Sequence, residues 1–279
     1  MRSGYFALAI SLTSFFGFSQ NDQDALRYSQ TGIGGNARFV SMSGAFGALG
    51  GNVSCLNYNP AGIGIYRKGE LNISPGINFN TINSSYNGSG TKYFTPSLVF
   101  NGFGIAGSWQ SHDNEDVRHS LGLSLNQLQN FNSTISINGR SQGSSIMQDL
   151  IGNAGTSSIA QLDPSYSNLA YKTYLLDQDT VTKKYYGFID PKADLAQSKT
   201  ITRSGKMNEY AIGYTYAYLD KLYLGASIGI PVISYNNAAS YTEADDKDSL
   251  RIYRDANNQM KSTYSYHVYY YNNSANTNL

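Results

Sequence analysis

Cysteine, histidine and charged residues are all scarce in this chain of 279 residues. Because Cys55 is the only cysteine, an internal disulfide and a metal site built on paired cysteines are both excluded. The 20 Lys and Arg residues are balanced by 19 Asp and Glu, so no excess of positive charge supports nucleic-acid binding. The polarity of the chain comes instead from Asn, Ser, Thr, Gln and Tyr.

Long hydrophobic runs are also missing. The longest extends from residue 5 to 18, after Arg2 and before Ser19 and Gln20, which predicts a signal peptide over residues 1–20. This run is too short to cross a bilayer as a helix, and no cysteine follows it to carry a lipid anchor. The whole chain has 41% hydrophobic residues and a mean hydropathy of −0.36, which is typical of neither an ordinary soluble globule nor a helical membrane protein. Because the rest of the chain contains no apolar run near 18 residues, a secreted protein and a transmembrane barrel remain.

Strict alternation of apolar and polar residues favours the barrel. In the segment 70–80, for example, Leu71, Ile73 and Ile77 share one face, while asparagine, serine and glycine share the other. Each alternating segment has about the 9 to 11 residues that a tilted strand needs to cross a membrane. These segments are 70–80, 103–110, 119–127, 210–219 and 222–230. The 24 tyrosines and 12 phenylalanines fit a chain whose aromatic rings line membrane interfaces.

The connections predict a meander of eight strands in residues 70–279. Tight turns are expected at Asn101-Gly102, near Gln129-Asn130 and at Asp220-Lys221. The first is expected because Asn-Gly is a strong hairpin signal. The further strands expected are 93–100, 131–138 and 264–271. The long outer loops expected are 81–92, 111–118, 139–205 and 243–248, of which 139–205 is the longest. Short turns at one end and long loops at the other are typical of outer-membrane barrels.

A glycine-crowded stretch, residues 31–66, lies between the signal peptide and the first strand. Large apolar residues are interleaved with its glycines, which suits a compact irregular element packed inside another structure. Its segments Arg38 to Gly51 and Asn59-Pro60-Ala61-Gly62 resemble the N-terminal hatch of the FadL/TodX/OMPP1 family of outer-membrane transport proteins. The resemblance is to the Bacteroidetes form, whose members are often labelled hemin receptors.

This resemblance implies an all-β fold, a transmembrane antiparallel β-barrel with the N-terminal hatch, residues 21–69, inside the lumen. Barrels of the family have about 14 strands, so eight strands imply a partial barrel. The ending NNSANTNL, which is no aromatic-capped strand, leads to the same expectation of a fragment. A complete eight-stranded barrel is the competing interpretation, but such a barrel fills its interior with side chains and leaves no room for a hatch.

The resemblance also implies passive uptake of hydrophobic small molecules, of fatty-acid or aromatic-hydrocarbon type, across the outer membrane of a Gram-negative bacterium. The expected partners are this small molecule and outer-membrane lipid. Apolar residues expected near the lumen are Phe39, Phe46, Leu49 and Ile63. The motif Asn59-Pro60-Ala61-Gly62 is expected to anchor the hatch to the wall in preference to touching a ligand, because Asn-Pro initiates turns.

The longest predicted loop contains one helical pattern. Ile146, Met147, Leu150 and Ile151 fall on one face of a helix over 144–153, with Ser141 or Ser144 as its cap. In the family, helices of this loop help to form a capture groove for hydrophobic molecules. An amphipathic helix that only covers the barrel mouth is an equally good interpretation.

Four other functions remain open at this stage. A barrel of the same type can act as a docking platform for secreted or surface proteins, and haem-related uptake is suggested by the label of its relatives. His112, His119 and His267 nevertheless lack metal-ligand spacing, so no metal or cofactor is expected. A soluble β-sandwich adhesin is a third alternative. An enzyme has the least support, because no nucleophile elbow or phosphate loop occurs.

Overall fold

The computed structural model describes residues 22–141, 143–187, 189 and 193–247, and the strands at 253–254, 260–261 and 275–278. The predicted signal peptide and the predicted strand at 264–271 lie outside these residues. The helices are α2 (Asp22–Ser29), α3 (Ala37–Ser41), η1 (Val53–Asn57), η2 (Pro60–Ile65), α4 (Ile146–Ala154), η3 (Ile159–Gln161) and α5 (Ser167–Lys172). The strands are β1 (Glu70–Tyr86), β2 (Ser89–Gln110), β3 (Val117–Asn130), β4 (Ser133–Arg140), β5 (Leu176–Gln178), β6 (Tyr185–Gly187), β7 (Ala196–Tyr218), β8 (Leu222–Ala244), β9 (Tyr253–Arg254), β10 (Met260–Lys261) and β11 (Ala275–Asn278).

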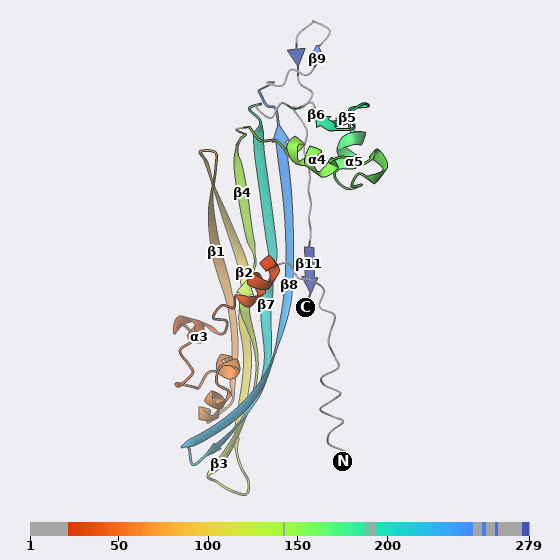
Figure 1. Ribbon diagram of the computed structural model, residues 1–279. Coiled ribbons are helices and arrows are strands. Elements are labelled where there is room, and N and C mark those ends of the chain that lie inside the picture. Colours follow the sequence, from red (N-terminus) through yellow and green to blue (C-terminus); the bar gives the residue numbers. More distant parts are fainter. Residues whose placement is uncertain are drawn as a thin grey trace, which may run out of the picture.

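Long antiparallel strands form the body of the molecule (Figure 1). A seven-stranded sheet has the order β1-β2-β3-β7-β8-β11, and β4 also pairs with β7. The strands β7 and β8 each have 23 residues, which corresponds to roughly 75 Å of extended chain. The prediction of a β-rich antiparallel fold is therefore confirmed. None of the helices in the described part of the chain is long and apolar enough to cross a membrane.

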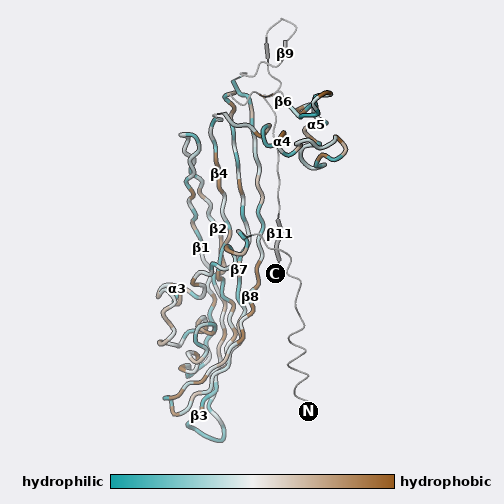
Figure 2. Tube along the Cα trace, viewed as in Figure 1, coloured by the Kyte–Doolittle hydropathy of each residue, from teal (hydrophilic) through white to brown (hydrophobic). Residues whose placement is uncertain are grey.

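The two faces of the sheet differ in chemistry, as the alternation predicts. One face, here called the outer face, carries exposed apolar side chains. Hydrophobic residues lie along the lower parts of the strands (Figure 2). They include Leu71, Ile73, Ile77, Phe79, Leu98, Phe103, Ile105, Leu121, Leu123, Ile212, Leu224, Ile228 and Ile230. On the opposite, inner face stand small residues, among them Gly104, Ala106, Gly122, Ala211, Gly213, Thr215 and Ala217. The alternating segments read from the sequence are thus the apolar parts of longer strands.

The predicted turn at Asn101-Gly102 is wrong, because both residues lie inside β2. The register shifts here: Ser74 pairs with Gly102 and Pro75 pairs with Phe100, which leaves Asn101 as the extra residue of a bulge. The hairpin turn lies instead at Asn87-Gly88, the other Asn-Gly pair in this part of the sequence, and both residues have positive φ angles of 47° and 83°. Most of the predicted loop 81–92 is consequently strand.

The predicted turn near Gln129-Asn130 is also wrong. After β3 the chain continues in the same direction as β4, because β3 pairs with the second half of β7 and β4 with the first half. The seven strands expected up to residue 244 are therefore five passes, namely β1, β2, β3 with β4, β7 and β8. The loop 111–116 lies at the same end as the turn 219–221, where Leu219 N donates to Asp116 O. We call this the lower end and the opposite end, with the Asn87-Gly88 turn, the upper end.

Residues 32–66, here called the N-terminal segment, pack against the inner face of the lower sheet (Figure 1). Its buried cluster consists of Phe39, Phe46, Val53, Cys55, Leu56 and Ile63, which contact Ala106 and Ala211 of the sheet. Glycines on the strands make room for these side chains. A β carbon at Gly104 would stand 2.1 Å from a methyl of Val53, and one at Gly213 would stand 2.5 Å from a methyl of Leu56.

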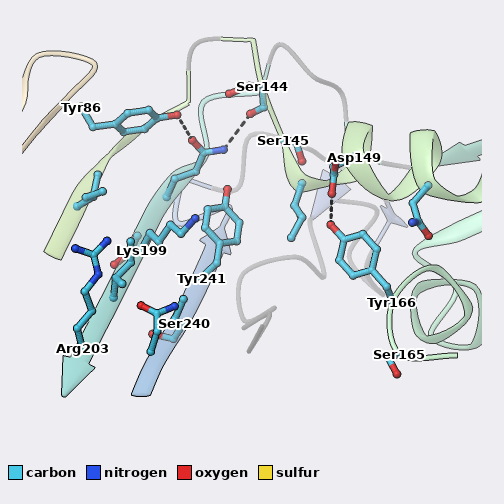
Figure 3. Close-up of a pocket in the computed structure, with 18 of the residues that line it drawn as sticks. Tyr86, Ser144, Ser145, Asp149, Ser165, Tyr166, Lys199, Arg203, Ser240 and Tyr241 are labelled. Atoms are coloured by element: carbon cyan, nitrogen blue, oxygen red, sulfur yellow. Dashed lines mark hydrogen bonds between the residues drawn. The ribbon is translucent and has the colours of Figure 1, made fainter. Parts of the chain in front are cut away.

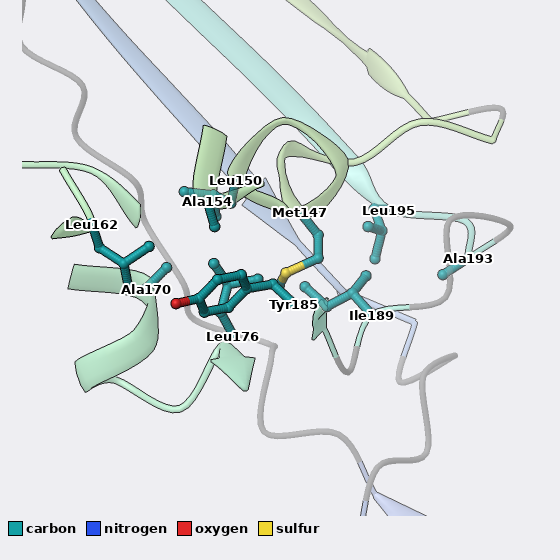
Figure 4. Packing of buried hydrophobic residues seen from close by; sticks show 10 residues of the cluster. All are labelled: Met147, Leu150, Ala154, Leu162, Ala170, Leu176, Tyr185, Ile189, Ala193 and Leu195. Carbon is teal, nitrogen blue, oxygen red and sulfur yellow. The ribbon is translucent and has the colours of Figure 1, made fainter. Parts of the chain in front are cut away.

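Residues 141–195, here called the cap, connect β4 to β7 in the sequence. The described residues of the cap lie at the upper end of the sheet (Figure 1). The cap has its own core, in which Met147, Leu150, Leu162, Ala170, Leu176, Tyr185, Ile189 and Leu195 are buried (Figure 4). The helix expected over 144–153 is observed as α4, and Ser145 is its N-terminal cap instead of Ser141 or Ser144. The predicted loop 139–205 is shorter than expected, because residues 196–205 belong to β7.

Candidate functional site

The motif Asn59-Pro60-Ala61-Gly62 fastens the N-terminal segment to the sheet. The Asn59 side chain accepts a hydrogen bond from Ala61 N, which caps η2, and its amide donates to Gly47 O. The Pro60 carbonyl accepts a 2.6 Å hydrogen bond from the Thr215 hydroxyl of β7. These contacts agree with the anchoring role that the sequence favours for the motif.

The four apolar residues expected near a lumen mostly serve as packing. Phe39, Phe46 and Ile63 are fully buried between the N-terminal segment and the sheet, where Phe39 and Phe46 stack with ring centroids 5.5 Å apart. Leu49 is 49% exposed. None of the four lines the cavity described next. The apolar character of the three buried residues is accounted for by the cluster that holds the segment to the wall.

A cavity of about 930 Å³ lies higher up, between the inner face of the strands and the cap (Figure 3). This volume is within the range of small-molecule sites. Its walls come from the tip of β1, from β4, β7, β8, the cap and α2. The lining residues are Arg27, Tyr86, Ile137, Ser144, Ser145, Ile146, Asp149, Asn153, Asp163, Ser165, Tyr166, Gln197, Ser198, Lys199, Ile201, Arg203, Asn237, Ala239, Ser240 and Tyr241.

A buried carboxylate, Glu243, closes the cavity at its upper side. It is 0% exposed and accepts hydrogen bonds from the Ser145 hydroxyl, from Ile146 N at 3.1 Å, from Gln197 Nε2 at 2.9 Å and from the Tyr241 hydroxyl at 2.6 Å. The protein's own anion thus occupies the N-terminus of α4, where backbone N–H groups favour negative charge. Burial and the hydrogen bond to Glu243 raise the pKa of Tyr241 far above its ordinary value, so its hydroxyl remains a donor.

Gln197 extends this network across three elements. Its carbonyl accepts a 2.7 Å hydrogen bond from the Tyr86 hydroxyl at the tip of β1, and its amide also donates to Ser144 O (Figure 3). The tip of the first hairpin, the strands β7 and β8 and the start of the cap are therefore joined above the cavity. This arrangement fixes the cap relative to the wall.

Two cationic side chains, Lys199 and Arg203, lie on the inner face of β7 and line the cavity wall (Figure 3). Two carboxylates, Asp149 and Asp163, line the cap side. Asp149 accepts a hydrogen bond from the Tyr166 hydroxyl, and Asp163 accepts one from Ser165 N at 2.8 Å. The positive and negative groups therefore stand on opposite sides of the cavity.

The residues expected to form a capture groove divide between two environments. Ile146 lines the cavity, whereas Met147 and Leu150 are each 1% exposed and belong to the cap core. Ile151 packs partly buried against the same core. The helical pattern of these four residues thus reports mainly the packing of α4 within the cap.

The sequence pattern does not identify Lys199, Arg203, Tyr86 or Tyr241 as site residues. It assigned positions 81–92 and 139–205 to loops, and a loop gives no face on which side chains can be aligned. Positions 197, 199, 201 and 203 do alternate on one face once β7 is known to begin at Ala196. The signal that could have identified these residues is the extended strand of mainly polar residues at the start of β7.

The histidines give no sign of haem or metal binding in the described residues. The Nδ1 atom of His119 lies 2.6 Å from the Tyr214 hydroxyl, and its ring packs beside Trp109 with centroids 5.8 Å apart. His267 lies outside the described residues. Within the described ranges, no three His, Cys, Asp or Glu side chains gather as a metal site requires.

No family model, no curated protein and no solved structure matches this chain. The features that bear on function are therefore the two faces of the sheet, the N-terminal segment and the cavity.

Proposed function

We propose that this chain supplies wall strands and the N-terminal hatch of an outer-membrane β-barrel that takes up hydrophobic small molecules passively. The observation that carries the proposal is the uncovered apolar outer face of the sheet. Leu98 is 83% exposed and Ile228 is 68% exposed, and neighbouring strands repeat the pattern side by side. Monomeric soluble proteins rarely expose apolar patches of more than a few hundred Å².

The height of this apolar band supports a bilayer as its solvent. On β8 the outer-face residues are apolar from Leu222 to Val232 and are polar or alanine from Ser234 upwards. About ten residues of a tilted strand match the ~25 Å apolar band of outer-membrane barrels. A soluble β-sandwich would require a second sheet over this face, and none is present among the described residues.

Aromatic residues gather at the lower edge of the band. On the outer face Trp109, His119 and Tyr216 lie at the same level of the sheet, since His119 pairs with both of the others. Tyr214 and Tyr218 flank this level on β7. Amphipathic rings of this kind favour the interface between lipid and water.

The packing on the inner face of the sheet is a further argument for the proposed hatch. The small residues of this face accept the N-terminal segment in close contact, which is the arrangement expected of a segment enclosed by a barrel wall. In the proposed mechanism the upper strands and the cap stand outside the cell, and a hydrophobic molecule passes when the N-terminal segment moves. Burial of apolar ligand surface supplies affinity at roughly 25 cal/mol per Å² before the costs of binding.

One observation favours a second candidate, a non-transporting barrel that docks secreted or surface proteins. Leu56 is fully buried against Gly122 and Gly213, and a β carbon at these glycines would stand 3.1 Å and 2.5 Å from its methyls. Packing this close resists movement of the segment. A permanently filled lumen would suit a platform better than a channel.

Uptake into lipid vesicles tests the proposal. The full-length protein is inserted, and entry of a labelled fatty acid and of an aromatic hydrocarbon is followed against empty vesicles. Faster entry than into empty vesicles is expected, with a changed rate after deletion of residues 21–69 and in Asn59→Ala. Asn83→Ala, an exposed position high on β1, serves as the matched control and should leave the rate unchanged.

Equal entry into empty and protein-bearing vesicles would overturn the transport proposal. Insertion without uptake, together with a stably bound protein partner, would favour the docking platform. A protein that stays soluble and monomeric without detergent would remove both candidates.

A further inference from the structure

Most of the side chains that line the cavity below the cap carry a hydroxyl, amide or charged group. Of its twenty lining residues, only Ile137, Ile146, Ile201 and Ala239 have purely apolar side chains. Hydroxyl and amide groups from β7, β8 and the cap make up most of the remainder, including Gln197, Asn237 and Tyr241. An apolar ligand placed here would strip water from these groups without replacing their hydrogen bonds, which costs free energy.

Lys199 and Arg203 add two positive charges that form no ion pair among the described residues. Among the described residues, the carboxylates that form ion pairs do so with Arg27, Arg67, Arg118, Arg140 and Lys247, and none with these two. The Nε atom of Arg203 is buried without a hydrogen-bond partner in this part of the chain. Buried charged donors are normally hydrogen-bonded, so a missing partner here indicates a ligand group.

The acidic residues of the cavity are already engaged with the cap. Asp149 is held by Tyr166, and Asp163 accepts the backbone N–H of Ser165. Glu243 is buried, accepts hydrogen bonds from four donors and lies at the start of α4. Lys199 and Arg203 therefore stand on the wall strand β7, whereas Asp149 and Asp163 lie on the cap side and accept hydrogen bonds there.

The position of the cavity excludes a lipid tail as the source of the anion. Its wall is formed by residues 197–203 of β7 and 237–241 of β8, above Val232, where the apolar band of the outer face ends. A ligand therefore reaches the cavity from water. We propose that this cavity is a binding site for a water-soluble anion that carries hydroxyl groups, such as a sugar phosphate, distinct from the hydrophobic cargo proposed above.

In this site Lys199 and Arg203 donate charge-assisted hydrogen bonds to the anionic group. Asn237, on the inner face of the neighbouring strand, faces the hydroxyl groups of the ligand. The cap closes over the ligand through the contacts of Glu243 and Gln197. The proposal does not depend on uptake, because binding is measured on the protein in detergent.

Calorimetric titration of the full-length protein in detergent with glucose 6-phosphate tests the site, with glucose and dodecanoate as comparison ligands. Glucose 6-phosphate is expected to bind, and glucose at least about tenfold more weakly, since one charge-assisted hydrogen bond contributes about that factor. The double variant Lys199→Gln, Arg203→Gln is expected to lose about tenfold or more in affinity. Lys206→Gln, on the same strand but on the outer face, is the matched control and should bind as the wild type does.

The single variant Lys199→Glu keeps the test valid if the double variant folds poorly, because the Lys199 side chain is exposed within the cavity. It should weaken binding more than Lys199→Gln. Absence of binding by the wild type, unchanged affinity in the variants, or displacement of glucose 6-phosphate by dodecanoate would each overturn the proposal. The last result would leave the uptake of hydrophobic molecules intact, and failure of uptake would leave this site intact.

Discussion

Gly225 on β8 lies directly beneath the backbone of Ala61: a β carbon at position 225 would stand 2.4 Å from the Ala61 amide nitrogen. It would also stand 2.6 Å from the Pro60 carbonyl carbon. Backbone atoms cannot rotate away as the end of a side chain does. The N-terminal segment and the wall therefore meet through main chain at this point, next to the hydrogen bond between Thr215 and Pro60.

Gly225→Ala is expected to loosen the N-terminal segment from the sheet. Overpacking of a close contact costs about 1–3 kcal/mol, and here the contact involves main chain on both sides. Urea unfolding in lipid vesicles, followed by fluorescence of Trp109, the single tryptophan, measures the change. Gly107→Ala is the matched control, because a β carbon at position 107 meets nothing within 4 Å. Equal stability of the two variants would contradict the observed contact.

Gly88→Ala is expected to destabilise the first hairpin. The φ angle of Gly88 is 83°, in the left-handed region where a side chain costs about 1–2 kcal/mol. Gly90→Ala lies two residues further on, in β2, and has open space around its β carbon, so it should be nearly neutral. Urea midpoints of the two variants give the comparison. A Gly90 variant as unstable as the Gly88 variant would argue against this turn.

Two of the three Asn-Gly pairs, Asn87-Gly88 and Asn101-Gly102, show how far the sequence determines this fold. Alternation correctly marked the apolar parts of the strands, because outer-face and inner-face positions differ in chemistry. Asn87-Gly88 and Asn101-Gly102 are identical dipeptides, and only tertiary pairing decides that the first turns and the second bulges. A local signal cannot rank two equal turn candidates, so the boundaries were misplaced although the strand character was right.

The upper halves of the strands could not be predicted for a different reason. Residues 196–205 of β7 alternate between groups that are polar on both faces, because one face lies in water and the other lines a polar cavity. The alternation of apolar and polar residues is absent where both faces of a strand contact water or polar groups. The cavity residues could not be predicted for the same reason. Lys199 and Arg203 share one face of β7, and the pattern did not predict a strand there.

Ile228→Arg distinguishes a lipid-facing surface from a water-facing one. Ile228 is 68% exposed on the outer face of β8, so in water the change would be nearly neutral. In a bilayer, arginine near the midplane of a barrel costs about 2–4 kcal/mol. We expect a loss of this size in folding into vesicles, and little effect from Thr202→Arg, an exposed position on the upper part of β7. Similar folding of both variants would argue against membrane insertion at this height.

The junction between the cap and the sheet is predicted to weaken in acid. Arg140, the last residue of β4, contacts Asp194 at 2.5 Å and Asp246 at 2.8 Å, and Lys247 contacts Asp194 at 2.6 Å. Hydrogen bonds from Lys247 and Arg140 lower the pKa of Asp194, and the one from Arg140 lowers the pKa of Asp246. Both carboxyls therefore favour the folded junction above their unfolded pKa of about 4, and this contribution is lost as the pH falls through their lower folded values.

Protease digestion of the cap measures this effect between about pH 6 and about pH 3, the range that brackets the unfolded carboxyl pKa. Cleavage between residues 141 and 195 should become faster toward the acid end in the wild type. Arg140→Gln removes the cation that both carboxyls share, so its cleavage should be faster at about pH 6 and should change less with pH. Arg67→Gln, whose ion pair with Asp220 lies at the lower end of the sheet, should follow the wild-type profile. If Arg140→Gln kept the full acid response, groups other than this cluster would have to hold the cap in place.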